Sequence, residues 1–173
     1  MIGARHLNLS VQRDVTEAKS RLAHLSLLTL NLRLMENWRS LQITAWNRVL
    51  GYDSTLIVMA IIVISTEKLL RTELDPRLQT LAHPLPRDRL GRVNFSSIAA
   101  ATGINRETVR RKVIELVDAG ILLRDDAGVR MAEGRIPFAV LRETIDAQLD
   151  AITRTANQLS KLGVFVPSDC PEW

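Results

Sequence analysis

Residues 94–120 read NFSSIAAATGINRETVRRKVIELVDAG, and this stretch decides which fold the sequence predicts. Asn94 is suited to begin a short helix over residues 95–102, because its side chain can accept a hydrogen bond from a free amide of the first turn. Gly103 follows at the point where the chain must turn sharply, and glycine adopts a positive φ at little cost. The order of these residues predicts a short helix that ends in a tight turn.

A second helix is predicted over residues 106–119, between a capping residue, Asn105, and a terminating residue, Gly120. At about 100° per residue, one side of this helix is apolar and the opposite side is charged. The apolar side consists of Val109, Val113 and Leu116, and the charged side of Arg106, Glu107, Arg110 and Arg111. We therefore expect the apolar side to face a core and the charged side to face solvent or a partner.

A β-hairpin is predicted directly after the second helix. Residues 121–124 and 129–131 are short strand-like runs, and residues 125–128 form an Asp/Gly turn between them. Behind two helices joined by a turn, such a hairpin is the wing of a winged helix. The turn itself is acidic, so we expect Arg124 and Arg130, rather than the tip, to contact phosphate.

Helices are also predicted before residues 93–132, the helix-turn-helix and hairpin that we call the module. No Gly or Pro occurs between Ala4 and Leu50, and apolar residues recur there at steps of three and four, from Val11 to Val49. This spacing predicts one long helix or two helices with a bend. Residues 56–64 are rich in Ile and Val, so a buried strand is an alternative. A helix is favoured, because residues 67–71 extend the segment to helical length.

The remaining segments are a linker, a helix and a tail. Residues 75–92 are rich in proline and arginine, which indicates a loop or linker. A long helix is predicted to begin at Pro137, to continue with apolar residues at heptad-like steps, and to end before Gly163. The predicted organisation is N-terminal helices over 1–74, a linker over 75–92, a helix-turn-helix and wing over 93–132, a C-terminal helix over 135–163 and a tail over 164–173.

Composition restricts the class of protein. The chain has 173 residues and a formal net charge of +4, which favours an anionic partner. Cys170 is the only cysteine, which excludes an internal disulfide and suits a reducing cytoplasm. The longest apolar run has nine residues, 56–64, whereas a membrane span needs roughly 20. We see no secretory signal and expect a soluble, cytoplasmic protein with no membrane partner.

Residues 94–131 resemble bacterial winged helix-turn-helix transcription regulators. The matching features are Ile98-Ala99, Gly103-Ile104, Thr108-Val109, Leu116 and Ala119-Gly120-Ile121. The layout of the whole chain is similar to the multiple-antibiotic-resistance regulator (MarR) family, in which terminal helices form a homodimer around winged modules. The resemblance implies a mostly α fold: a winged helix-turn-helix, with a three-helix core and a small β-hairpin wing, flanked by long N- and C-terminal dimerisation helices.

The candidate DNA contacts follow from side-chain chemistry. The start of a recognition helix enters the major groove, where arginine pairs with guanine O6 and N7 and glutamate accepts from cytosine N4. Short hydroxyls and the arginines of the hairpin suit phosphate oxygens. The expected DNA-binding residues are Ser96, Ser97, Asn105, Arg106, Glu107, Thr108, Arg110, Arg111, Arg124 and Arg130. Arg111 could instead pair with Glu107 or Glu115, four residues on either side.

A homodimer is the favoured assembly. One recognition helix seldom gives enough affinity, whereas two-fold symmetry would place two of them on half-sites roughly 34 Å apart. The alternative is that helix 137–162 packs only against the N-terminal helices of its own chain. Trp38 and Trp46 lie on nearly one helix face and could line a pocket for a small-molecule effector among residues 10–70, although core packing is favoured.

We therefore expect a sequence-specific DNA-binding transcriptional regulator. Its rivals are a winged helix that binds another protein without DNA, and a small-molecule-binding helical protein. His6, His24 and His83 are scattered, with no carboxylate or cysteine at ligand spacing, so no metal site is expected. We find no catalytic set and no phosphate-binding glycine loop, so neither an enzyme nor a cofactor is expected.

Overall fold

The computed structural model describes residues 9–11, 17–71 and 90–167 of the chain. Its contacts divide the chain into two compact units. The helical unit comprises residues 1–38 and 143–173, and the central unit comprises residues 39–142. The linker predicted over 75–92 falls almost entirely outside the described residues, as does Cys170.

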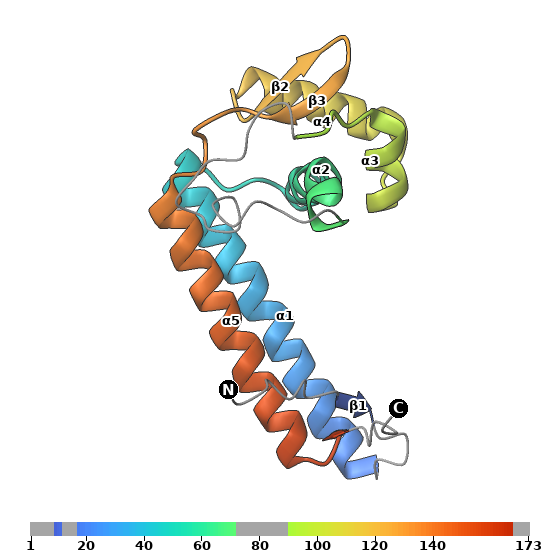
Figure 1. The fold of residues 1–173 in the computed structure, drawn as a ribbon, viewed down its shortest axis with the longest axis vertical. Helices are drawn as coiled ribbons and strands as arrows, with labels where there is room; N and C mark the ends of the chain where they lie inside the picture. Colours follow the sequence, from blue (N-terminus) through green and yellow to red (C-terminus); the bar gives the residue numbers. More distant parts are fainter. Residues whose placement is uncertain (1–8, 12–16, 72–89, 168–173) are drawn as a thin grey trace, which may run out of the picture. The chain divides into compact units, whose positions relative to one another are not determined.

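Helices dominate the described residues, and the strands are short (Figure 1). The helices are α1 (Glu17–Trp46), α2 (Tyr52–Arg71), α3 (Phe95–Thr102), α4 (Arg106–Asp118) and α5 (Phe138–Lys161). The strands are β1 (Leu9–Val11), β2 (Leu122–Asp125), β3 (Gly128–Met131) and β4 (Phe165–Pro167). Among these described elements, no helix combines the length and the apolar character that crossing a membrane requires.

Most predicted elements are confirmed with small shifts at their ends. The alternative of a strand over residues 56–64 is wrong, because the whole segment lies within α2. The two short helices of the module and the hairpin after them lie where their capping and turn residues placed them. The long C-terminal helix begins one residue after Pro137 and ends at Lys161.

The beginning of the chain departs from the prediction. The spacing predicts helix from Val11 onward, but residues 9–11 form β1, which pairs antiparallel with β4 and aligns Val11 with Phe165. The helix begins only at Glu17, and it continues unbroken to Trp46. A three-residue strand whose partner lies more than 150 residues away leaves no local pattern in the sequence, so spacing alone could not reveal it.

The core of the central unit lies where α2 meets the module. Helix α2 packs against α3, α4 and β3, and α4 also packs against α3 and β2. The fully buried side chains here include Ile57, Ile61, Ile98, Val109, Val113, Ile121 and Val129. The inward stripe predicted for α4 is therefore confirmed. Lys112, at the edge of that stripe, is half-buried, and its amine reaches the Glu115 carboxylate at 2.8 Å.

Polar contacts hold the junction between α1 and α2. The buried Gln42 side chain donates to the Thr55 hydroxyl (2.9 Å) and accepts from the Leu50 amide (2.8 Å). Trp46 is also buried, and its indole Nε1 donates to the carbonyl oxygen of Arg135 at 2.8 Å. These contacts fit the structural role that was favoured for Trp46, whereas Trp38 belongs to the helical unit.

The helical unit contains the first part of α1 and most of α5, closed at one end by β1 and β4 (Figure 1). On α5, the buried side chains Thr144, Ala151, Thr155 and Leu159 lie within about 80° of arc. On α1, by contrast, several large apolar side chains are exposed. They include Leu22, Leu25, Leu27, Leu28, Leu32 and Met35.

Gly128, at the start of β3, generates a stability prediction. Its φ is +137°, and a Cβ atom there would lie 2.9 Å from the carbonyl oxygen of Val93. We expect Gly128→Ala to lower the free energy of unfolding by about 1–3 kcal/mol, because it adds backbone strain and a clash with main-chain atoms. Urea unfolding of the purified protein measures this change.

Gly51→Ala is the matched control, because a Cβ at Gly51 would meet no atom within 4 Å. We expect this variant to unfold at nearly the wild-type urea concentration. Equal unfolding curves for the two variants would contradict the close approach of Gly128 to Val93.

Candidate functional site

Both ends of α3, the first helix of the module, are capped by hydrogen bonds. The Asn94 side chain accepts from the Ser97 amide at 2.8 Å, as predicted from its capping character. At the other end, Gly103 has a φ of +70° and donates its amide to the carbonyl oxygen of Ala99 at 2.9 Å. Only three residues, 103–105, therefore separate the end of α3 from the start of α4.

The start of α4 is capped in the same way. The Asn105 side chain accepts from the Glu107 amide at 2.9 Å. This contact occupies the side-chain oxygen of Asn105, so the residue predicted to touch DNA has a structural role as well. Arg106, Glu107 and Arg110 follow on the exposed side of the helix.

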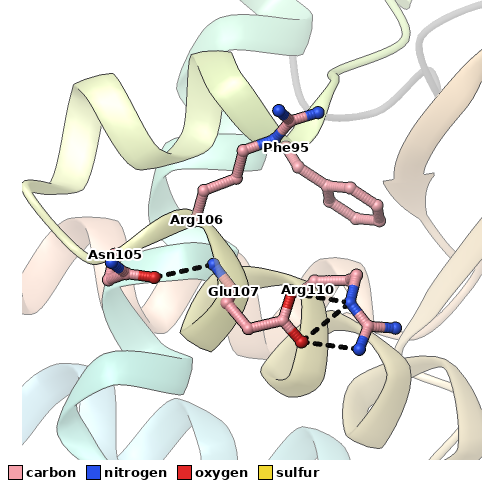
Figure 2. A pocket seen from close by; sticks show the side chains of 5 residues that line it. All are labelled: Phe95, Asn105, Arg106, Glu107 and Arg110. Carbon is pink, nitrogen blue, oxygen red and sulfur yellow. Dashed lines mark hydrogen bonds and ion pairs between the residues drawn. The ribbon is translucent and has the colours of Figure 1, made fainter.

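These residues surround one hollow of about 350 Å³ at the junction of α3 and α4. Its lining consists of Phe95, Asn105, Arg106, Glu107 and Arg110 (Figure 2). In this view, the side chains of Glu107 and Arg110 point toward one another, while Arg106 extends away from them. Phe95 therefore supplies an aromatic ring to the hollow, and Asn105 supplies the side-chain amide that caps α4. Of the two guanidinium groups, that of Arg110 is paired with Glu107 and that of Arg106 extends away from the pair.

Glu107 and Arg110 form a side-on ion pair. Arg110 Nε lies 3.0 Å from both carboxylate oxygens, and Arg110 Nη2 lies 2.6 Å from Oε1. The hydrogen bonds from Arg110 lower the pKa of the Glu107 carboxyl, with smaller coulombic help from Arg110 and Arg111. Glu107, which we expect to accept from cytosine N4, therefore also accepts hydrogen bonds from Arg110.

The hairpin joins the module through Val93. Val93 exchanges two backbone hydrogen bonds with Val129, of 3.0 and 2.9 Å. This isolated antiparallel bridge adds Val93 to the edge of β3. The turn of the hairpin is closed by Asp125, whose Oδ1 accepts from the Ala127 amide at 3.1 Å. The other oxygen of Asp125 pairs with Arg92 Nε at 2.9 Å. The negative charge of the turn is therefore partly neutralised by Arg92, which precedes the hairpin in the chain.

Arg124 connects the hairpin to the hollow. Its guanidinium carbon lies 5.2 Å from the centre of the Phe95 ring, which is within the range of a cation–π contact. This contact places a third arginine close to the residues at the start of α4. Phe95 was read from the sequence only as the first residue of a helix, and its ring contact was not predicted.

The other predicted DNA contacts are more dispersed. Ser96 is exposed and Ser97 is half-buried on the first turn of α3, while Thr108 is half-buried on α4. Arg111 is exposed. Its two expected partners pair with other side chains, Glu107 with Arg110 and Glu115 with Lys112. Arg130 has a side chain only 17% exposed, and its Nη1 pairs with Glu133 at 3.3 Å. The structure thus groups Asn105, Arg106, Glu107, Arg110 and Arg124 and leaves Arg130 largely covered.

Two further residues belong to this surface, although no local sequence pattern indicates them. Phe95 lines the hollow, and Arg92 neutralises the hairpin turn. Arg92 was assigned to the linker, and its partner Asp125 is 33 residues away, so no local spacing signalled the pair. The surface is suited to bind an anion or a base edge by hydrogen bonding. Across the described ranges, no group of three or more His, Cys, Asp or Glu side chains is arranged to hold a metal ion.

Comparison of the chain with models of protein families, with curated proteins and with solved structures gave no match. Function is therefore inferred from the residues of this chain.

The Arg92–Asp125 pair generates a pH prediction. The hydrogen bond from Arg92, with help from the Ala127 and Gly128 amides, lowers the pKa of the Asp125 carboxyl. A carboxyl whose folded pKa is lowered adds stability above its ordinary pKa of about 4, and this stability is lost as the pH falls through the folded value. Because the pair is partly exposed, we expect Asp125→Asn to reduce the urea midpoint only slightly at pH 7 and to leave it unchanged near pH 2.

Asp126→Asn serves as the control, since it removes one charge from the same exposed turn. A deficit for Asp125→Asn that is equally large at both pH values would show that the ion pair is not its source.

Proposed function

We propose that residues 93–132 form a winged helix-turn-helix that binds double-stranded DNA, and that the chain is a transcription regulator of MarR-like layout acting as a homodimer in the bacterial cytoplasm. In this proposal, α4 is the recognition helix and enters the major groove. The hairpin β2–β3 is the wing, and α2, α3 and α4 make the three-helix core.

The observation that carries the proposal is the division of α4 into two faces. Val109 and Val113 are fully buried, so the rotation of the helix about its axis is fixed. The opposite face presents Arg106, Glu107 and Arg110 beside the open hollow. Guanidinium groups on the first turns of a fixed, exposed helix suit base edges and phosphates of the major groove.

The hairpin supports the same proposal. It follows α4 after a short turn and is joined by the bridge to Val93, which sits next to the cap of α3. Arg124 lies on strand β2 over the ring of Phe95, and Phe95 lines the hollow with the first residues of α4. A cation held there could contact the phosphate backbone beside the groove that α4 enters.

The homodimer is supported by the exposed apolar residues of α1. Leu25, Leu28, Leu32 and Met35 are between 45% and 70% exposed, and they fall within about 80° of arc on one side of the helix. A continuous apolar patch of this kind marks a protein contact. A second copy of the chain is the proposed occupant, because binding two DNA half-sites requires two recognition helices.

The same apolar patch favours the second candidate function, a winged helix that binds a different protein and no DNA. The arginines of α4 favour DNA over this candidate, because a protein-binding surface at its core is depleted of charge. A small-molecule effector of the regulator stays an additional proposal based on layout.

DNA binding is tested by fluorescence anisotropy of the purified protein with a random-sequence duplex at about 50 and 200 mM salt. We expect log affinity to fall with log salt by about 0.9 per phosphate contacted. We expect Arg106→Ala to weaken binding by roughly tenfold, because it removes one cation from the groove-facing turn. Absence of binding at 50 mM salt would overturn the proposal in favour of the protein-binding candidate.

Arg154→Ala is the matched control for this measurement. Arg154 is an exposed arginine of α5 that pairs with Asp150, so the variant loses the same charge outside the proposed surface. Equal losses of affinity in the two variants would indicate a general charge effect rather than a contact from α4.

The dimer is tested by light scattering after size exclusion. Leu32 is 70% exposed and central in the apolar patch. We expect Leu32→Glu to convert a dimer into a monomer, because it places a charge within an apolar interface. Asn31→Glu alters an exposed neighbour and controls for the added charge. A wild-type protein with the mass of one chain would contradict the homodimer.

A further inference from the structure

The Glu107–Arg110 pair leaves one particular edge of the guanidinium available. Glu107 occupies the side made by Nε and one N–H of Nη2, with contacts of 3.0 and 2.6 Å. An arginine has five N–H donors in a fixed planar fork. The end of the fork, made by one N–H of Nη1 and the second N–H of Nη2, carries two parallel donors that Glu107 does not occupy.

This end of the fork matches one base edge in the major groove. Guanine presents two adjacent acceptors there, O6 and N7, and a guanidinium pairs with both at once. Adenine presents an acceptor beside a donor, and thymine presents a single acceptor beside a methyl group. The two parallel donors therefore have a complementary partner in guanine among the four bases.

The carboxylate makes the arginine a better selector of guanine. It restricts a flexible side chain to one orientation before DNA arrives, which reduces the entropy lost on binding. The cap at Asn105 fixes the backbone from which the Glu107 side chain extends, because the Glu107 amide donates to the Asn105 side chain at 2.9 Å. The low pKa of the Glu107 carboxyl keeps the pair charged under ordinary conditions.

Resting on the proposed function, we propose that Glu107 is a positioning residue that presets Arg110 to read a guanine in each half-site. Arg110 makes the base contact, and Glu107 acts through it rather than by reading cytosine itself. The hollow of about 350 Å³ beside the pair provides room for the base edge, and Phe95 forms its apolar wall (Figure 2).

The test begins with selection of duplexes from a random-sequence library by the wild-type protein. We expect the selected duplexes to share a guanine in each half-site. Replacement of that guanine by 7-deazaguanine removes the N7 acceptor, and we expect it to lower wild-type affinity by about tenfold. The same replacement should have almost no effect on Arg110→Ala, which lacks the reading side chain.

Glu107→Gln separates positioning from simple charge. Loss of a negative charge near phosphate should strengthen binding to random-sequence DNA, whereas loss of the preset arginine should weaken binding to the selected duplex. We therefore expect the ratio of selected to random affinity to fall by about tenfold. Glu115→Gln is the control, because its carboxylate pairs with Lys112 on the same helix. It should strengthen random binding similarly without lowering the ratio.

The outcomes distinguish this inference from the proposed function. If the wild type does not bind random duplexes at about 50 mM salt, the proposed function fails and the inference fails with it. If it binds but selects no shared guanine, or if Glu107→Gln keeps the ratio of Glu115→Gln, only the inference is overturned. A tenfold fall that is confined to Glu107→Gln and Arg110→Ala supports it.

Discussion

The burial of one face of α4 is the constraint on which the central unit depends. Val109 and Val113 are inaccessible to solvent and Leu116 is only 2% exposed, and each such side chain contributes roughly 1.5–3 kcal/mol when it leaves water. Helices α2 and α3 and strand β2 supply the surfaces that cover this face. Because the helix cannot rotate without exposing these residues, its opposite face, with Arg106 and Arg110, is directed to solvent. The candidate site is therefore a consequence of core packing.

Acidic residues organise this cationic surface instead of cancelling it. Glu107 pairs with one edge of Arg110, and Asp125 pairs with Arg92 at the turn of the hairpin. Exposed ion pairs of this kind contribute little to stability, so their effect is mainly geometric. Each carboxylate restricts the orientation of a guanidinium that would otherwise sample many rotamers. Fewer free rotamers mean a smaller entropic cost when an anionic partner binds.

The helical unit has the opposite character. Its α1 helix exposes Leu25, Leu28 and Leu32, while α5 buries small and polar residues such as Ala151 and Thr155. An exposed apolar stripe of this kind favours contact with another protein surface, through the same hydrophobic effect that forms the core of the central unit. The two units therefore differ in surface character, which is apolar along α1 and cationic at the start of α4.

The sequence by itself determined the local elements around residues 94–131, because caps, turns and helical spacing act over a few residues. Asn94, Gly103 and Asn105 marked the helix ends correctly, and the stripe of α4 identified its buried face. Only the tertiary structure decided which side chains meet across long separations. It paired β1 with β4, brought Arg92 to Asp125, and set Arg124 over Phe95. Such pairings depend on how distant segments pack together. The periodicity within one segment carries no information about the segment with which it pairs.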